Sequence, residues 1–357
     1  MARFLTGANL LRLLLVFVPI AIYLGRTHAS PTWVFVFCCL AILPLAGLMG
    51  EATEHITHHT GPGIGGLMNA SFGNAAELII AFIALKAGET EIVKASLTGS
   101  IIGNMLMVLG LSMLLGGWKH KELKFSRIAG ESSSSMMVLA VVSLVIPAIY
   151  ANVSQHKNPA HIESLSFDIS WVLLLTYFAS LVFSLKSHKH LFAGEGSDDL
   201  HHDGPVWSVV KSVAVLIVAA GFVGWISEFL VHAVGEAGAS MGMSKVFMGV
   251  VVVAIVGNAA EHSTAILVAM KGKMDLSLGI AMGSSMQIAL FVAPVLVIAG
   301  HFMGQPLGLA FTILEVVAVF LSVGAVSLLV IDGRTNWFEG VQLLAIYTIL
   351  AMAFYFV

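Results

Sequence analysis

The chain has 357 residues, of which 58% are hydrophobic and only 10% are charged, and its formal net charge is −3 at pH 7. A soluble domain carries about 25% charged residues, so this composition excludes an ordinary soluble enzyme and a disordered chain, and the lack of a basic field excludes a nucleic-acid binder. The two cysteines, Cys38 and Cys39, are adjacent and lack the spacing of a zinc site, so the sequence predicts an all-α polytopic membrane protein with no cofactor.

A membrane span needs about 20 mainly apolar residues, and the chain contains eleven such segments. The first has a basic flank, which is also typical of a signal peptide. It contains Pro19, however, and no small-residue cleavage site precedes Arg26, so we expect a retained helix. The predicted spans are about 8–25, 32–58, 62–86, 92–116, 132–151, 166–186, 206–233, 244–270, 275–300, 307–331 and 336–357.

The basic residues predict the direction of these spans. The N-terminal side of the predicted membrane holds twelve Lys and Arg residues and the other side holds five, which together are the seventeen of the chain. Since positive loops stay in the cytoplasm, we expect the N-terminus inside the cell and the C-terminus outside it. The expected location is a prokaryotic cell (inner) membrane.

A short motif occurs twice. Gly73–Glu77 and Gly257–Glu261 both read Gly-Asn-Ala-Ala-Glu, and each lies in a long apolar span. Each copy is followed by a polar, glycine-containing helix with a buried amide, Ser100–Asn104 in the first case and Gly283–Gln287 in the second. The repetition of both motif and context indicates an internal repeat.

The two copies lie five spans apart, so they cross the membrane in opposite directions. This is an inverted-topology repeat, which places a substrate site near the bilayer midplane at the interface of the repeats. The predicted divisions are an N-terminal helix (1–30), a five-helix repeat (31–190), a short acidic linker (191–205) and a second, inverted five-helix repeat (206–357).

The motif offers oxygen ligands on one helix face. Asn74 lies three residues before Glu77, as Asn258 does before Glu261, so each pair shares a face. A carboxylate at bilayer depth costs about 2.5 kcal/mol or more, and no Lys or Arg lies nearby within a span to pair with it. An all-oxygen set suits a hard ion such as Ca²⁺. The predicted ligands are Glu77, Glu261, Asn74, Asn258, Asn104 and Gln287.

Both glutamates can also bind protons. Since each carboxylate holds either a share of Ca²⁺ or a proton, the two ions compete for one site, and this competition couples their movement. The alternative is that both acids stay protonated as hydrogen-bond donors between helices. The glycines of the motifs either let helices approach closely or break them to free carbonyl groups.

The two motifs also carry a family resemblance. Asn69–Glu77 and Val253–His262 resemble the paired conserved motifs of the cation/proton exchanger branch of the Ca²⁺/cation antiporters. This resemblance implies eleven spans, alternating access, and Ca²⁺ export from the cytosol in exchange for protons. It implies that Glu77 and Glu261 are the central ligands, and that Glu54 and Glu228 act in proton coupling or ion entry.

Four further groups have open roles. His262 either relays protons or only hydrogen-bonds across helices. The Glu51–His59 run is either a polar helix end in an aqueous vestibule or an ion-entry or pH-sensing element. Glu315 lies within a predicted span without an assigned role. The linker acids either lie in a solvated loop or bind regulatory Ca²⁺, and these residues are Glu195, Asp198, Asp199, His201, His202 and Asp203.

The alternatives to Ca²⁺/H⁺ exchange are Na⁺/Ca²⁺ or Mn²⁺/H⁺ antiport and, less favoured, a cation channel. Na⁺-coupled relatives tend to place hydroxyl side chains beside the glutamates, whereas Asn74 and Asn258 supply amides here. No nucleophile–base pair and no HExxH motif supports an enzyme. The expected partners are therefore Ca²⁺, H⁺ and the lipid bilayer.

Overall fold

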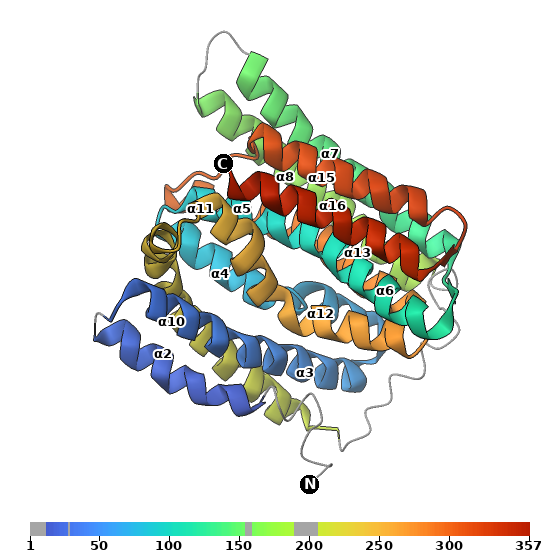
Figure 1. Cartoon of the computed structure of the whole chain (residues 1–357), viewed down its shortest axis with the longest axis horizontal. Helices are drawn as coiled ribbons and strands as arrows, with labels where there is room; N and C mark the ends of the chain where they lie inside the picture. The colour runs from blue at the N-terminus through green and yellow to red at the C-terminus, as the bar shows by residue number, and fades with distance from the viewer. Residues whose placement is uncertain (1–11, 28, 154–158, 189–205) are drawn as a thin grey trace. The chain divides into compact units, whose positions relative to one another are not determined.

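The computed structural model describes residues 12–27, 29–153, 159–188 and 206–357, and helices dominate these residues (Figure 1). In the first half the helices are η2 (Leu14–Val16), α2 (Phe17–Arg26), α3 (Pro31–Phe72), α4 (Ala75–Lys86), α5 (Thr90–Ile102), η3 (Gly103–Val108), α6 (Leu109–His120), α7 (Arg127–Val153), α8 (Pro159–Val182) and η4 (Phe183–Ser187). In the second half they are α10 (Val209–Ser240), α11 (Lys245–Phe247), η6 (Met248–Val253), α12 (Ala254–Met270), α13 (Met274–Gln287), η7 (Ile288–Val292), α14 (Ala293–Met303), α15 (Ile313–Leu329) and α16 (Trp337–Tyr355). Strands β1 (Leu123–Lys124) and β2 (Arg334–Thr335) form one antiparallel pair.

The apolar helices agree with most of the predicted spans. Within the described residues, eight helical stretches are long and apolar enough to cross a membrane. They are Pro31–Thr60, Thr90–His120, Arg127–Val153, Ala160–Ser187, Val209–Ser240, Lys245–Met270, Met274–Met303 and Trp337–Tyr355. Two shorter apolar helices, Leu14–Arg26 and Ile313–Leu329, lie at the first and tenth predicted spans. The all-helical membrane fold is confirmed, whereas eleven separate spans stay a prediction.

One predicted boundary is wrong. We expected the second and third spans to separate between residues 58 and 62, but α3 continues to Phe72. Pro62 removes only one backbone donor from the helix, and helices in apolar surroundings accommodate such a loss. The chain turns instead at Gly73 and Asn74, and α4 begins at Ala75.

The chain forms two compact units, which we describe separately. The first comprises Met1–Ser96, Gly204–Ala260 and Tyr355–Val357, and the second comprises Leu97–Asp203 and Glu261–Phe354. Each unit combines segments of both predicted repeats. The predicted boundaries and the inverted relation of the repeats stay predictions, and the linker acids lie outside the described residues.

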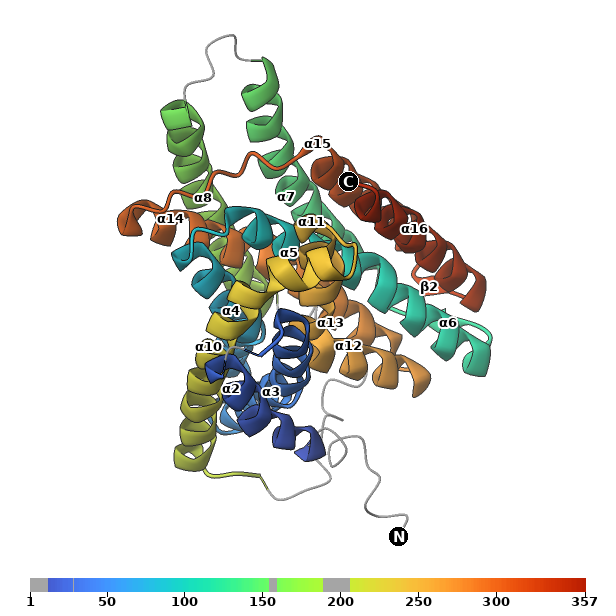
Figure 2. The same cartoon turned by 60° about the vertical axis from the view of Figure 1, so that its left-hand side comes forward.

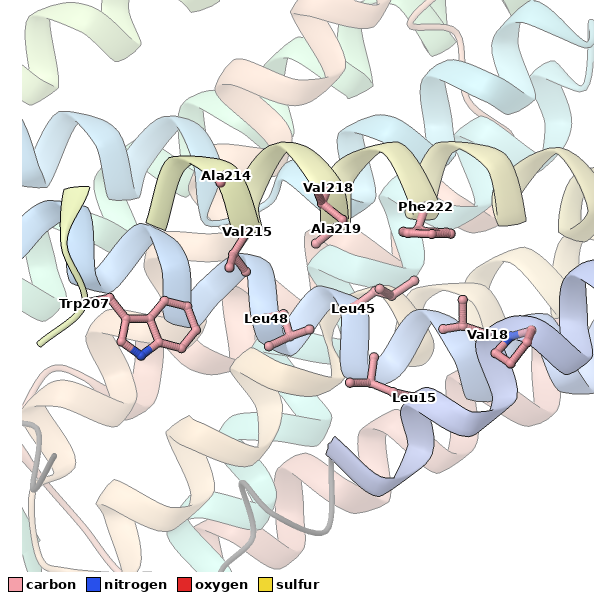
Figure 3. A pocket seen from close by; sticks show the side chains of 11 residues that line it. Leu15, Val18, Leu45, Leu48, Trp207, Ala214, Val215, Val218, Ala219 and Phe222 are labelled. Atoms are coloured by element: carbon pink, nitrogen blue, oxygen red, sulfur yellow. The ribbon is translucent and has the colours of Figure 1, made fainter. Parts of the chain in front are cut away.

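In the first unit, α2, α3 and α10 lie side by side (Figures 1 and 2). The hydroxyl groups of Thr32 and Ser240 are 2.7 Å apart at one end of α3 and α10, and the ring of His59 meets the backbone of Trp207 at the other. The two helices are therefore antiparallel. An apolar groove lies between these three helices (Figure 3).

In the second unit, glycines bring α6 and α16 into backbone contact. A side chain on Gly117 would lie 2.5 Å from the backbone nitrogen of Trp337, and one on Gly340 would lie 2.5 Å from that of Leu114. Beside this seam, β1 pairs with β2 in the register Leu123↔Thr335. The loop after α6 is therefore bound to the loop before α16.

Among the residues that the structure describes, four segments have π-helical hydrogen bonding, and two of them occur at corresponding places in the predicted repeats. The third helix of the first repeat contains η3, and the third helix of the second contains η7. Asn104 is the second residue of η3, and Gln287 directly precedes η7. Since π-helical segments often occur at functional sites, both predicted amide ligands lie where the helix is locally widened.

Candidate functional site

The first half of the candidate site lies at the break between α3 and α4. Asn74 occupies the N-cap position of α4 with φ −98° and ψ 29°, and its side chain is buried. Glu77 lies in the first turn of α4. The positive end of a helix dipole favours a carboxylate there, so the turn at Gly73 and Asn74 gives Glu77 an electrostatic environment that a continuous helix would lack.

Glu77 packs against the second copy of the motif within the first unit. A Cβ atom on Gly257 would lie 3.3 Å from Oε1 and 3.4 Å from Cγ of Glu77. An added methyl group would therefore displace the carboxylate by a few tenths of an ångström, and glycine permits this close approach. The next residue, Asn258, is buried and donates from Nδ2 to the carbonyl oxygen of Ala254 at 2.9 Å. The remaining polar atom of its side chain is the carbonyl oxygen Oδ1, an acceptor.

The second half of the site is a chain of hydrogen bonds in the second unit. Nε2 of His262 is 3.0 Å from Oδ1 of Asn104. Nδ2 of Asn104 donates to the hydroxyl group of Ser284 at 3.0 Å, and the Ser284 side chain hydrogen-bonds to Glu261. All four residues come from three helical segments, α12, η3 and α13, which are far apart in the sequence.

The donors and acceptors fix the direction of the hydrogen bonds in this series. The amide oxygen of Asn104 only accepts, so Nε2 of His262 carries the hydrogen. Ser284 accepts from the Asn104 amide and therefore directs its own O–H to Glu261. A neutral amide does not pass protons on. This series of hydrogen bonds therefore orients Glu261 and does not connect it to His262 for proton transfer. Ser284 was not among the predicted site residues.

Glu261 retains room for a cation or a proton. Its Oε2 atom is buried, and no donor among the described residues forms a hydrogen bond to it. A buried carboxylate oxygen is costly unless it is paired or protonated. The hydrogen bond from Ser284 therefore leaves one oxygen of Glu261 with unsatisfied binding capacity.

The other predicted ligands and glycines have varied positions. Gln287 lies three residues after Ser284 on α13, hence on the same face. A Cβ atom on Gly103 or Gly283 would meet open space. The close-approach interpretation is therefore wrong for these two glycines and correct for Gly257. Gly103 instead begins the π-helical segment η3.

The two entry candidates lie on exposed helix faces. Glu54 on α3 and Glu228 on α10 are both exposed side chains in the first unit. Their predicted role in proton coupling or ion entry stays a prediction.

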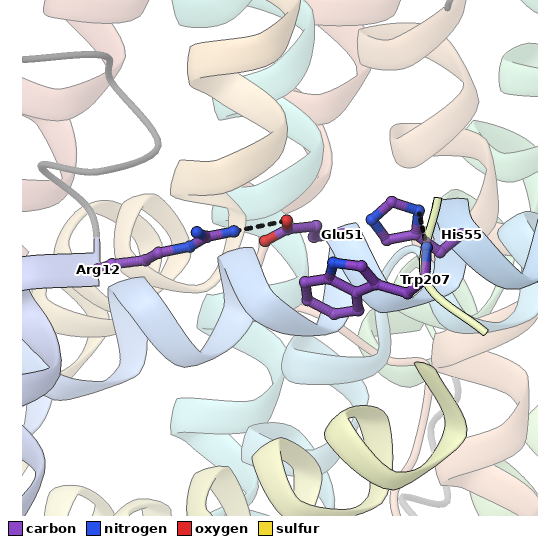
Figure 4. A network of polar contacts seen from close by, with 4 residues as sticks. All are labelled: Arg12, Glu51, His55 and Trp207. Atoms are coloured by element: carbon purple, nitrogen blue, oxygen red, sulfur yellow. Dashed lines mark hydrogen bonds and ion pairs between the residues drawn. The ribbon is translucent and has the colours of Figure 1, made fainter. Parts of the chain in front are cut away.

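The Glu51–His59 run binds neighbouring segments of the first unit (Figure 4). Glu51 forms an ion pair with Arg12 at 2.7 Å. His55 is buried and stacks on Trp207 with a centroid distance of 4.6 Å, and its Nδ1 accepts from the Trp207 backbone at 3.4 Å. His59 donates to the Trp207 carbonyl oxygen at 2.8 Å. The run therefore fixes the start of the second half of the chain.

Glu315 has a structural partner that the sequence did not reveal. It forms a capping box with Thr312 at the start of α15: its Oε2 accepts from the Thr312 backbone and hydroxyl groups, both at 2.8 Å. Its Oε1 is 3.5 Å from the hydroxyl group of Thr98. This buried acid therefore satisfies the first turn of a helix.

We expect Glu315→Ala to lower the free energy of unfolding by about 1 kcal/mol, the usual cost of a lost cap, while Glu315→Gln keeps ion exchange. Denaturant titration in mixed micelles measures the first effect, and flux into proteoliposomes measures the second. Loss of exchange in Glu315→Gln with unchanged stability would instead assign this acid to the ion pathway.

Each half thus pairs a glutamate with neutral oxygen groups. Among the described residues, no group of three or more His, Cys, Asp and Glu side chains is arranged to hold a metal ion. A resident soft-metal centre therefore has no support in the part of the chain that the structure describes. Whether the two halves form one site stays a prediction.

These features define a helical membrane protein with buried carboxylates, amides and hydroxyl groups in its spans. The family described as sodium/calcium exchanger protein matches residues 30–186 and 211–356. The chain belongs to this family, which is a family of transporters and not of enzymes.

Several known proteins are similar over nearly the whole chain. The Ca²⁺/H⁺ antiporter of Aphanothece halophytica is 44% identical over 360 residues, which cover 96% of this chain and 95% of the relative. The Ca²⁺/H⁺ antiporter of Synechocystis sp. is 44% identical over 370 residues and 98% of both chains. The solved structure of native YfkE superposes with a TM-score of 0.85 at 40% identity and covers 97% of this chain and 99% of that one. The predicted membership of this superfamily is confirmed.

Proposed function

We propose that the chain is a secondary active Ca²⁺/H⁺ antiporter that exports Ca²⁺ from the cytosol in exchange for protons. Two observations support the proposal: relatives at 44% identity are named Ca²⁺/H⁺ antiporters, and each copy of the repeated motif carries one intramembrane glutamate. The observation that carries it is the buried Oε2 of Glu261, which is oriented by Ser284 yet open to a cation or a proton.

In the proposed mechanism, Glu77 and Glu261 bind Ca²⁺ together and bind protons when Ca²⁺ leaves. The two carboxylates supply two negative charges, and Asn74, Asn258 and Asn104 with Gln287 add neutral oxygen groups, a set suited to Ca²⁺. Two carboxylates that are neutralised when the ion leaves take up two protons. Alternating access of the site to the two sides of the membrane then couples the two ion flows.

Gly257 supports a shared site through helix geometry. It packs against Glu77 and lies four residues before Glu261, hence on the same face of α12. His262 acts in this proposal as a positioning residue, because Asn104 stands between it and the Ser284–Glu261 pair. Glu54 and Glu228 remain candidates for ion entry.

The closest alternatives keep the fold and change the ions. Na⁺ in place of H⁺ gives Na⁺/Ca²⁺ exchange, and Mn²⁺ in place of Ca²⁺ gives Mn²⁺/H⁺ exchange, since both divalent ions accept oxygen ligands. A passive channel is less favoured because one acid in each inverted half fits alternating access. We also propose a bacterial cell membrane as the location, with the N-terminus inside, as the basic residues indicate.

The decisive experiment is ⁴⁵Ca²⁺ uptake into proteoliposomes under an imposed pH gradient, with and without Na⁺. We expect uptake to reverse with the sign of the pH gradient and to be unchanged by Na⁺, because protons compete for the same carboxylates. Uptake that requires Na⁺ contradicts proton coupling. Uptake that persists unchanged when the pH gradient is collapsed indicates a channel.

A further inference from the structure

A hydrocarbon-lined groove lies in the first unit, and none of the candidate ion-site residues lines it (Figure 3). Its volume is about 470 Å³, and α2, α3 and α10 form its walls. The lining includes Leu15, Val18, Leu48, Trp207, Val215 and Phe222, and the only heteroatom among all its lining side chains is the indole nitrogen of Trp207. Such a groove matches small-molecule sites of about 300–1,000 Å³, but it accepts only an apolar group.

The groove has one polar end. Arg12 lies one helical turn before the lining residue Leu15, and Lys211 lies one turn before Ala214. Nζ of Lys211 is 4.2 Å from the centre of the Trp207 ring. Two cations on different helices therefore flank the end that Trp207 covers, and an indole is well suited to a membrane–water interface.

The length of the groove matches one leaflet of a bilayer. Its lining on α10 extends from Ala214 to Phe222, and the eight helical steps between them cover about 12 Å. Half of the hydrocarbon thickness is about 15 Å. The positive end lies on the side that the basic residues predict to be cytoplasmic, where anionic lipids concentrate.

We propose that this groove holds one acyl chain of an anionic glycerophospholipid, with the lipid phosphate beside Lys211 and Arg12. The acidic groups near this end are Glu51, which pairs with Arg12 at 2.7 Å, and the exposed Glu54. These two acids offset part of the positive charge of Arg12 and Lys211, so this end of the groove fits a headgroup of low charge. The lipid tail supplies the apolar group that the walls require, and Trp207 covers the junction between tail and headgroup.

The test uses the full chain, reconstituted with equal amounts of dioleoyl phosphatidylglycerol and dioleoyl phosphatidylcholine, then extracted and examined by native mass spectrometry. We expect one retained phosphatidylglycerol per chain, with a roughly tenfold preference over phosphatidylcholine from the two cations. Ala214→Phe fills the groove at an exposed lining position and should lower lipid occupancy about tenfold. Ile217→Phe is the matched control, because Ile217 is also exposed on α10, at 66%, but is not among the lining residues.

Lys211→Gln should keep a bound lipid and lower the preference for phosphatidylglycerol to about threefold, because Arg12 remains. Should Ala214→Phe fail to fold, Val218→Phe replaces it, since this lining side chain is 57% exposed. The proposal is overturned by a wild-type chain that retains no lipid, by equal binding of both lipids to it, or by equal occupancy in Ala214→Phe and Ile217→Phe.

Discussion

Glu261→Gln and Glu77→Gln are each expected to lower proton-driven Ca²⁺ uptake about a hundredfold or more. In the proposed mechanism, either substitution removes one of the two charges that bind Ca²⁺, and losing one partner of a buried charge interaction costs about 3–5 kcal/mol. Glutamine keeps the size of the side chain, so the loss reports charge and protonation. The measurement is ⁴⁵Ca²⁺ uptake into proteoliposomes at equal protein content.

Two controls separate the site from the fold. Glu131→Gln makes the same chemical change at a surface acid that pairs with Arg127 at 2.7 Å, and it should leave uptake unchanged. Thermal unfolding of Glu261→Gln should occur at the same or a higher temperature than in the wild-type chain, because a carboxylate within a span is costly. Wild-type exchange by either variant would show that the assigned carboxylate does not bind the transported ion.

Gly257→Ala is expected to lower uptake about tenfold, and Gly257→Val about a hundredfold. The added Cβ atom would lie 3.3 Å from Oε1 of Glu77, so the carboxylate has to shift by a few tenths of an ångström for Ala and further for Val. Displacements of about 1 Å in a reacting group cost about a hundredfold in rate. Initial rates of Ca²⁺ uptake measure the effect.

The matched control is Gly279, which lies on α13 with open space around its Cβ position. Gly279→Ala and Gly279→Val should exchange ions at nearly the wild-type rate. Because Ala stabilises a helix by about 0.5–1 kcal/mol over Gly, Gly257→Ala should not unfold earlier than the wild-type chain. Equal rates for the Gly257 and Gly279 variants would contradict a role for the contact with Glu77.

The sequence was informative where a property repeats along one helix. Hydropathy alone located most of the apolar helices, because a helix in hydrocarbon must be apolar over its whole length. The motif copies at Gly73–Glu77 and Gly257–Glu261 were equally visible. Since side-chain spacing along a helix is fixed by its period, the pairing of Asn74 with Glu77 on one face required no tertiary information.

The features that the sequence did not reveal depend on contacts between distant segments. Ser284 joins Asn104 to Glu261 only because α13 packs beside η3 in the second unit. Nothing in the sequence around Ser284 indicates that it contacts these distant residues. Glu315 belongs to a capping box with Thr312. The threonine three positions earlier could have revealed this role in the sequence. The continuity of α3 past Pro62 was missed because a proline between two glycines resembles a turn.

The strand pair β1–β2 has a mechanical consequence for the second unit. Its register at Leu123 and Thr335 joins two loops, while Gly117 and Gly340 bring the helices beside them into backbone contact. Sliding α6 along α16 would break the hydrogen bonds of the strands and drive side chains into the opposite backbone. These two helices should therefore act as a single strut during transport, and amide hydrogen exchange along them should be equally slow with and without Ca²⁺.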